Sequence, residues 1–177
     1  LVNSVILVMP EKDVEAGRAE WMKPQGIVRN VVAGGAKRQD SVYRGFKALD
    51  VDTEIVIVHD GVRPFITPQM IRQTVEAACQ HGAAITAVPV SDTIKQVSSG
   101  GLVERTIDRD GLWRVQTPQA FRYKILQSAF EKAFADSFYG TDEGALIEYI
   151  GKEVKVVAGS ELNIKITRPE DLILGGC

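Results

Sequence analysis

The sequence contains few cysteines, few histidines and no long apolar run. Its 177 residues include two cysteines and two histidines. Cys79 and Cys177 are too few for a disulfide framework and have no metal-ligand spacing, which indicates a reducing compartment. The longest apolar run, Val5 to Met9, is far shorter than the roughly 20 residues that span a bilayer. These absences argue against a membrane protein, a zinc site and a hydrolase with a Cys/His or Ser/His/Asp arrangement.

An excess of charge of either sign is also missing. The chain has 21 Lys and Arg against 23 Asp and Glu, for a formal net charge of -2. Nucleic acid is therefore not the expected partner, because phosphate backbones are bound by a concentrated basic face. The hydrophobic and charged fractions, 45% and 25%, are those of an ordinary globular protein and exclude a disordered chain.

The first half of the chain alternates apolar, β-branched segments with helical patterns. We expect strands at 2–9, 27–33, 55–58 and 84–90. A helix is expected after Asp40-Ser41, and a second one after the N-cap Thr67 and Pro68. Residues 11–18 are expected to form a loop or a short exposed helix. Continuous apolar strands alternating with helices predict an α/β fold, Rossmann-like, with a mostly parallel sheet that carries helices on both faces.

The alternation of apolar strands and helices ends after residue 90. Thr93 to Val97 and Leu102 to Ile107 alternate apolar and polar residues around a Ser-Ser-Gly-Gly turn. This pattern predicts a weakly buried β-hairpin, which either packs on another subunit or extends the main sheet. Helices are expected at 124–135 and after Thr141, strands at 154–158 and 163–167, and a last helix from Pro169. No linker is visible, so we expect one domain, 1–177, with a hairpin arm at about 92–116.

Ligands of doubly wound sheets bind beyond the carboxyl ends of the strands, so the loops there hold the candidate residues. Asp60 directly follows a buried strand and Arg63 comes three positions later. Such a pair can hold Mg²⁺ and a phosphate, or it can be an Asp-Gly turn with a local ion pair. His59 is interpreted as a structural histidine rather than a base. The Gly34-Gly35 loop could favour an anion at a helix N-terminus, but alone it is better read as a tight turn.

Other polar residues have ordinary explanations when taken alone. Arg109 lies between two acids in what reads as a solvated turn, and Lys165 lies between two isoleucines as a surface lysine would. Thr117 and Thr141 occur at expected turn and N-cap positions. The residues by themselves thus indicate an α/β domain that binds a phosphorylated ligand, and they go no further.

Six segments in order give a more specific indication: VVAGGAKRQDSV, VHDGVRPF, VPVSDTIK, DRDGLWRVQTPQAF, TDEG and NIKITRPEDL. With these, the sequence from Val2 to Leu174 resembles the 2-C-methyl-D-erythritol 4-phosphate cytidylyltransferase family. The resemblance implies transfer of CMP from CTP to methylerythritol phosphate, with release of pyrophosphate, in nonmevalonate isoprenoid synthesis. It also implies Mg²⁺, a homodimer joined through the hairpin arm, and a location in the bacterial cytoplasm or a plastid.

The resemblance also assigns roles to single residues. Gly35 and Ser41 match contacts to the cytosine base, and Asp60 matches an acid near the metal, the nucleotide and the substrate. Arg109 and Lys165 match residues that position the attacking phosphate, and Lys165 also contacts the nucleotide. Substrate contacts are further implied for Arg63, Thr93, Thr117 and Thr141, with Thr93 and Arg109 reaching the partner's site. No general base is needed, because the attacking phosphate is already an anion.

The sequence departs from the family at three places. Ala36 stands where some relatives have an acid, and Gly61-Val62 replaces small residues after the aspartate. Leu1 to Asn30 contains no match to the family's glycine-rich phosphate loop, and the chain starts without Met. We therefore expect an N-terminally incomplete domain that turns over poorly or not at all. The alternatives are a ribitol 5-phosphate cytidylyltransferase, disfavoured by the run from Asp108 to Trp113, and a non-catalytic binding or dimerisation module.

Overall fold

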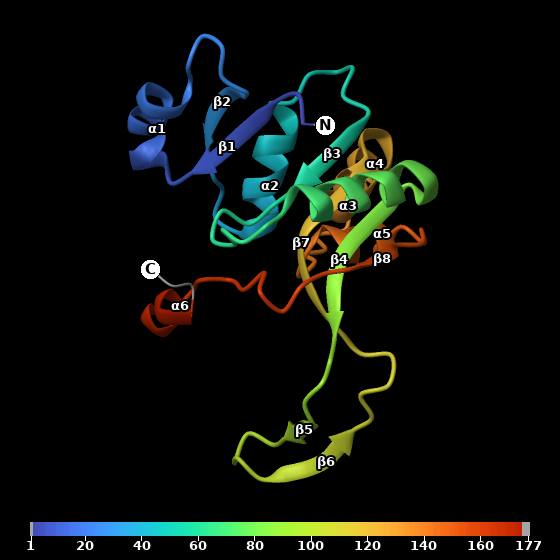
Figure 1. Cartoon of the computed structure of the whole chain (residues 1–177). Coiled ribbons are helices and arrows are strands. Elements are labelled where there is room, and N and C mark those ends of the chain that lie inside the picture. The colour runs from blue at the N-terminus through green and yellow to red at the C-terminus, as the bar shows by residue number, and fades with distance from the viewer. Residues whose placement is uncertain (1, 175–177) are drawn as a thin grey trace.

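The structure is a computed structural model that describes residues 2–174. Its first half contains β1 (Val5–Met9), the 3-10 helix η1 (Glu11–Asp13), α1 (Val14–Trp21), β2 (Val28–Ala33), α2 (Arg38–Lys47), β3 (Ile55–Val58), α3 (Pro68–His81) and β4 (Ala83–Pro89). The second half contains β5 (Ile94–Val97), β6 (Val103–Ile107), β7 (Trp113–Arg122), α4 (Tyr123–Ala135), α5 (Glu143–Tyr149), β8 (Lys155–Ala158) and α6 (Pro169–Leu174). Figure 1 shows their arrangement.

The central sheet has four strands in the order β3-β7-β4-β8. β4 and β8 are parallel, whereas β7 lies antiparallel between β3 and β4. The expected α/β fold is confirmed, but the sheet is mixed rather than mostly parallel. The error comes from β7, which the sequence analysis did not recognise as a strand. Its polar residues and Pro118 are typical of a turn, yet Gln116, Thr117 and Gln119 are buried and hydrogen-bonded there.

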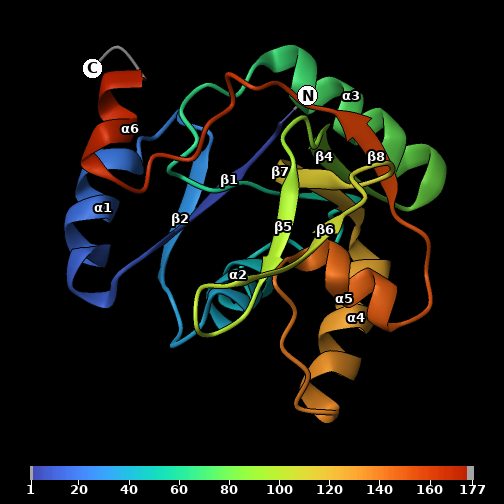
Figure 2. The ribbon, with the colours of Figure 1, turned by 90° about the horizontal axis from the view of Figure 1, so that it is seen from below.

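Helices cover both faces of this sheet, as Figures 1 and 2 show. On one face, α4 and α5 build the larger core around Phe121, Phe130 and Leu146, each with no exposed surface. α3 packs on the other face, where small side chains at Ala78 and Ala84 let the helix approach the strands closely. Thr67 caps α3 by accepting a hydrogen bond from the Met70 amide at 3.2 Å, as its sequence position predicted.

The first two strands form a separate parallel pair. Among residues 2–174, neither strand of this pair is hydrogen-bonded to the central sheet. The expectation that both faces of the first strand are covered is wrong for this structure, because Val8 remains 37% exposed. Of the two alternatives for residues 11–18, the short helix is correct: α1 begins at Val14.

The predicted hairpin is confirmed as β5 and β6, which pair antiparallel and extend away from the rest of the chain (Figure 1). Its apolar residues Leu102 and Val103 are 75% and 61% exposed. The return strand β7 already pairs with β4 from Trp113 onward, so residues 113–116 belong to the central sheet. β5 and β6 form a separate two-stranded sheet, so the hairpin does not extend the central sheet.

The segment after β8 corrects one further expectation. Residues 163–167 form no strand ladder. Instead, the segment crosses from β8 toward α6 in an extended form (Figure 2), and the Ile166 amide donates to the Val62 carbonyl at 2.8 Å. The alternation predicted there still holds locally, because Lys165 is exposed between two half-buried isoleucines.

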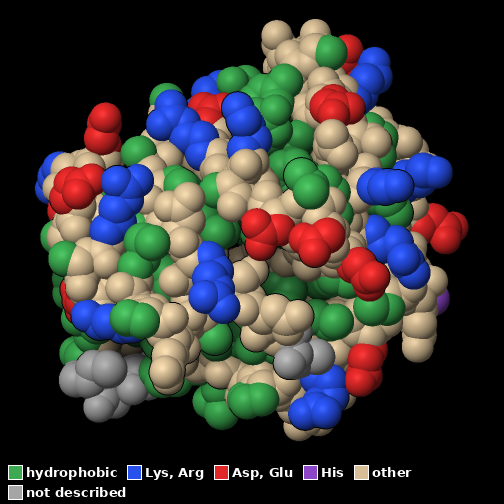
Figure 3. Space-filling view, turned by 90° about the horizontal axis from the view of Figure 1, so that it is seen from above, with side chains coloured by type: hydrophobic (Ala, Val, Ile, Leu, Met, Phe, Trp, Pro, Cys, Tyr) green, Lys and Arg blue, Asp and Glu red, His purple; other side chains and the backbone are tan. Residues whose placement is uncertain are grey.

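The surface agrees with the balanced charge of the sequence. Figure 3 shows basic and acidic side chains interspersed on one face, with apolar side chains between them. None of the helices within residues 2–174 has the length and apolar character needed to cross a bilayer.

Candidate active site

Asp60 is the centre of a charged cluster just after β3. Its carboxylate lies 3.1 Å from Lys165 Nζ, 3.5 Å from Arg63 Nε and 3.7 Å from Arg38 Nη2. Burial acts to raise the pKa of Asp60, but the hydrogen bond and charge of Lys165, together with Arg38 and Arg63, outweigh it and lower the pKa. Arg38 is shared with a second acid, Glu143, at 2.8 Å, and the three cations still outnumber the two acids, which suits a polyanionic ligand.

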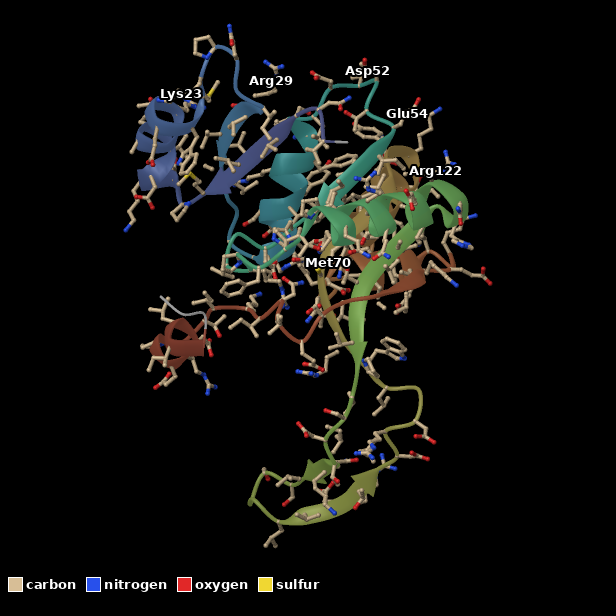
Figure 4. All side chains as sticks on the ribbon, in the orientation of Figure 1. Lys23, Arg29, Asp52, Glu54, Met70 and Arg122 are labelled. Atoms are coloured by element: carbon tan, nitrogen blue, oxygen red, sulfur yellow. The ribbon has the colours of Figure 1, made fainter. Side chains whose placement is uncertain are left out.

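Three separate parts of the chain bring these cations together. Arg38 is the first residue of α2, Arg63 belongs to the turn after β3, and Lys165 comes from the segment that follows β8. The labelled charges Asp52, Glu54 and Arg122 lie at the opposite end of β3 and β7 (Figure 4). The cluster therefore occupies the carboxyl end of β3, where the sequence analysis placed the candidate loops.

Arg38 and Glu143 form an ion pair that the sequence analysis missed. Arg38 Nη1 donates to Glu143 Oε1 at 2.8 Å, and the Glu143 side chain is only 1% exposed. Its other oxygen, Oε2, has no hydrogen-bond partner among the residues that the structure describes. Burial raises the pKa of Glu143 despite the opposing charge of Arg38. The available signal was the TDEG segment, which puts this acid in the first turn of α5.

Thr117 lies inside β7 and not in the turn that its surrounding sequence suggests. The Asp60 amide donates to Thr117 Oγ1 at 3.0 Å, and the same hydroxyl lies 3.0 Å from His59 Nδ1. His59 Nε2 lies 3.1 Å from the Arg63 carbonyl. Burial lowers the pKa of His59. Thr117 is thus brought next to the backbone of Asp60.

Asn163 holds the segment that carries Lys165. Its side-chain amide donates to the Thr117 carbonyl at 2.9 Å and to Gln116 Oε1 at 3.3 Å, and Arg63 donates to its carbonyl at 2.7 Å. Asn163 has no exposed surface. A cavity of about 360 Å³ opens beside these residues and is lined by Arg63, Arg114, Val115, Gln116, Glu161, Asn163, Ile164 and Lys165.

The loop between β2 and α2 is tightly packed against the first turn of that helix. Ser41 Oγ accepts from the Gly35 amide at 3.0 Å and donates to the Lys37 carbonyl at 3.0 Å. A Cβ atom on Gly35 would lie 2.4 Å from that of Asp40, so only glycine fits. The helix begins at Arg38 and not after Asp40-Ser41 as expected. The two predicted base-binding residues therefore contact each other, close to Arg38.

The remaining candidates are placed less centrally. Thr141 directly precedes Asp142, which caps α5 by accepting from the Ala145 amide at 2.9 Å. Thr93 and Arg109 flank the hairpin strands, and the Arg109 guanidinium donates to the Ser91 carbonyl. A single chain thus brings together Asp60, Arg63, Thr117 and Lys165, while Thr93 and Arg109 remain on the arm.

Magnesium was predicted at Asp60. No group of three or more His, Cys, Asp or Glu side chains within residues 2–174 could hold a metal ion alone. Mg²⁺ is commonly bound by one or two carboxylates together with substrate phosphates. Asp60 supplies one such carboxylate beside three cations. These residues fit an ion that arrives with a triphosphate, which would balance the positive charge.

Comparison with known proteins gives a consistent result. Residues 1–176 match the family model described as 2-C-methyl-D-erythritol 4-phosphate cytidylyltransferase. Relatives with that name are 48% identical in Syntrophus aciditrophicus, over 98% of this chain and 75% of the relative, and 49% identical in Pelotomaculum thermopropionicum, over 97% and 73%.

Solved structures of proteins from the same family are also similar to this chain. The 4-diphosphocytidyl-2C-methyl-D-erythritol synthase of Anaerococcus prevotii is 38% identical, with a TM-score of 0.87 over 97% of this chain and 79% of that chain. The cytidylyltransferase of Thermus thermophilus is 32% identical, with a TM-score of 0.82 over 97% and 79%. The chain therefore belongs to the 2-C-methyl-D-erythritol 4-phosphate cytidylyltransferase family.

Proposed function

We propose that CTP and methylerythritol phosphate meet at the cluster around Asp60. The chain is a cytidylyltransferase, which transfers CMP from CTP to methylerythritol phosphate. The observation that carries the proposed location is the Asp60 carboxylate, which lies within 4 Å of three cations from three parts of the chain. Such a site can hold two polyanions side by side and neutralise the charge that develops between them.

The reaction needs alignment more than acid-base catalysis. A phosphate oxygen of methylerythritol phosphate attacks the α-phosphorus of CTP, the new oxygen–phosphorus bond forms, and pyrophosphate leaves with the electrons of the broken bond. Lys165 is 42% exposed and next to the cavity, so its ammonium can move from Asp60 to both phosphates. Arg63, Thr117 and Thr141 would bind the attacking substrate, and Gly35 and Ser41 the cytosine base. Asp60 would hold Mg²⁺, which would neutralise phosphate charge.

The hairpin arm formed by β5 and β6 carries two further residues of the proposed site. Thr93 and Arg109 lie on the hairpin, outside the cluster of their own chain. Because its apolar residues Val97, Leu102 and Val103 are exposed, a second copy of the chain is a suitable partner for it. We therefore propose a homodimer in which each arm brings Thr93 and Arg109 to the partner's substrate. We also propose a cytoplasmic location, since the free Cys79 suits a reducing compartment and the relatives are bacterial.

Mixing two inactive variants tests the shared site. Asp60→Asn and Arg109→Ala are each expected to abolish turnover, and mixed dimers are expected to restore it because one of their two sites is intact. Random mixing makes about half of the dimers mixed, so activity should reach about a quarter of the unmutated value. Arg105→Ala on the same arm is the matched control and should behave like the unmutated chain. Without restoration in the mixture, Arg109 does not act on the partner's site.

A further inference from the structure

His59 occupies a junction between two parts of the proposed site. Its ring connects β7, through Thr117, with the turn after β3, through the Arg63 carbonyl. Thr117 Oγ1 in turn accepts the Asp60 amide hydrogen at 3.0 Å. Both ring nitrogens are therefore occupied by contacts within the protein, and neither is free to act as a base.

The chemistry of the partners fixes the direction of each hydrogen bond. A carbonyl oxygen can only accept, so Nε2 carries the hydrogen and donates to Arg63. In the neutral ring Nδ1 then accepts, and its donor is the Thr117 hydroxyl. Since the Asp60 amide donates to the same oxygen, the hydroxyl has one defined orientation. His59, the residue before Asp60, thus determines the orientation of the Thr117 hydroxyl.

We propose that His59 is a positioning residue for the methylerythritol phosphate site, acting through the Thr117 hydroxyl and the turn from Asp60 to Arg63. This inference rests on the proposed function. The turn itself closes with the Arg63 amide donating to the Asp60 carbonyl at 3.0 Å. The His59 ring therefore braces both ends of the turn, one through the Arg63 carbonyl and the other through Thr117 and the Asp60 amide. Loss of the ring would let Arg63 and Thr117 shift relative to each other, and misplacement by about 1 Å can reduce the rate of a positioned reaction about 100-fold.

Two conservative variants separate the two contacts of the ring. Asn places an amide oxygen near the position of Nδ1, so His59→Asn keeps an acceptor for Thr117. Gln places an amide nitrogen near Nε2, so His59→Gln keeps a donor for Arg63 but loses the acceptor. His59→Leu loses both. His81, the other histidine, is exposed at the end of α3, and His81→Asn is the matched control.

The measurements are the dissociation constant for methylerythritol phosphate by calorimetry, with a non-reacting methylene analogue of CTP present, and kcat and KM. We expect His59→Gln and His59→Leu to weaken methylerythritol phosphate binding about 10-fold to 100-fold, with CTP affinity changed less than two-fold. His59→Asn should stay within about five-fold of the unmutated chain. In a Thr117→Val background, His59→Leu should add only the smaller loss that belongs to the Arg63 contact, at most about five-fold, because the Thr117 contact is already removed.

Three results would overturn the proposal. The first is unchanged binding in His59→Leu with an unchanged melting temperature. The second is equal loss of CTP and methylerythritol phosphate affinity in every His59 variant, which a merely structural role would give. The third is full additivity of His59→Leu and Thr117→Val. If Thr117→Val and Asp60→Asn themselves bind and turn over normally, the proposed location of the site is wrong, which is a separate outcome.

Discussion

Replacing Glu143 with Gln should stabilise the protein at neutral pH. The carboxylate is 1% exposed and one of its oxygens has no partner. Burying an ionised carboxylate costs more than burying a neutral amide of the same shape, because the charged group loses more solvation. The opposing contribution is the ion pair with Arg38, which is 36% exposed and also faces Asp60. Gln keeps the volume and an acceptor for Arg38 while removing the buried charge. We expect the free energy of unfolding to rise by about 1 kcal/mol, or about 2–4 °C in melting temperature for a chain of this size.

The stability difference between Glu143→Gln and the unmutated protein should depend on pH. Burial raises the pKa of Glu143 in the folded state, so the folded protein holds this proton more tightly than the unfolded chain does. The contribution of protonated Glu143 to the free energy of unfolding is fully present below its pKa in the unfolded chain, about 4.3. That contribution is lost as the pH rises through the pKa of Glu143 in the folded protein. Glu143→Gln has no such loss. Its advantage over the unmutated protein should therefore grow with pH.

Urea unfolding followed by circular dichroism, at several values between pH 4 and pH 8, measures this difference. Glu148→Gln is the matched control, because Glu148 is exposed on the same helix, and it should change the free energy of unfolding by less than about 0.5 kcal/mol. If Glu143→Gln is less stable than the unmutated protein by the same amount at every pH, the ion pair with Arg38 dominates and the reasoning fails.

Three further predictions concern glycines and the Lys165 segment. Gly61→Ala should raise the free energy of unfolding by about 0.4–1 kcal/mol, because a Cβ there meets nothing within 4 Å and φ lies outside the left-handed region; a lower melting temperature would contradict this. Gly35→Ala should weaken CTP binding in calorimetry at least about 10-fold, since its Cβ would overlap Asp40, and unchanged affinity would count against the assigned base loop. Asn163→Ala should cost about 1–3 kcal/mol in urea unfolding and lower kcat by displacing Lys165; normal kcat and stability would refute its anchoring role.

The helices and the arm were predictable because their signals are local. Thr67 and Pro68 mark the start of α3, and the alternating pattern around the Ser-Ser-Gly-Gly turn specifies a hairpin. β7 could not be recognised in this way. Its Gln116, Thr117 and Gln119 are buried because distant residues satisfy them, among them Ser160 and Asp142. Hydrogen bonds to such distant residues cannot be recognised from the local sequence pattern of a strand.

In the candidate active site, too, residues with a local sequence signal were predictable and residues that depend on tertiary contacts were not. Asp60 and Arg63 were found because they lie three residues apart in the loop after an apolar strand. Glu143 escaped notice because the N-terminus of a helix is an ordinary place for an acid, and only its burial against Arg38 sets it apart. Lys165 read as a surface residue, and its exposure agrees. Its contact with Asp60 depends on Asn163 anchoring the segment across β7.

The most direct test of the account is to identify which alcohol phosphate receives CMP. The purified chain, in excess over CTP so that slow turnover still gives product, is incubated with Mg²⁺ and equal amounts of methylerythritol phosphate and ribitol 5-phosphate. Mass spectrometry then identifies the cytidylylated products, with Lys165→Met as the control. We expect 4-diphosphocytidyl-2-C-methyl-D-erythritol with the unmutated chain and at least about 100-fold less of it with the variant. Cytidylylated ribitol as the main product would contradict this expectation.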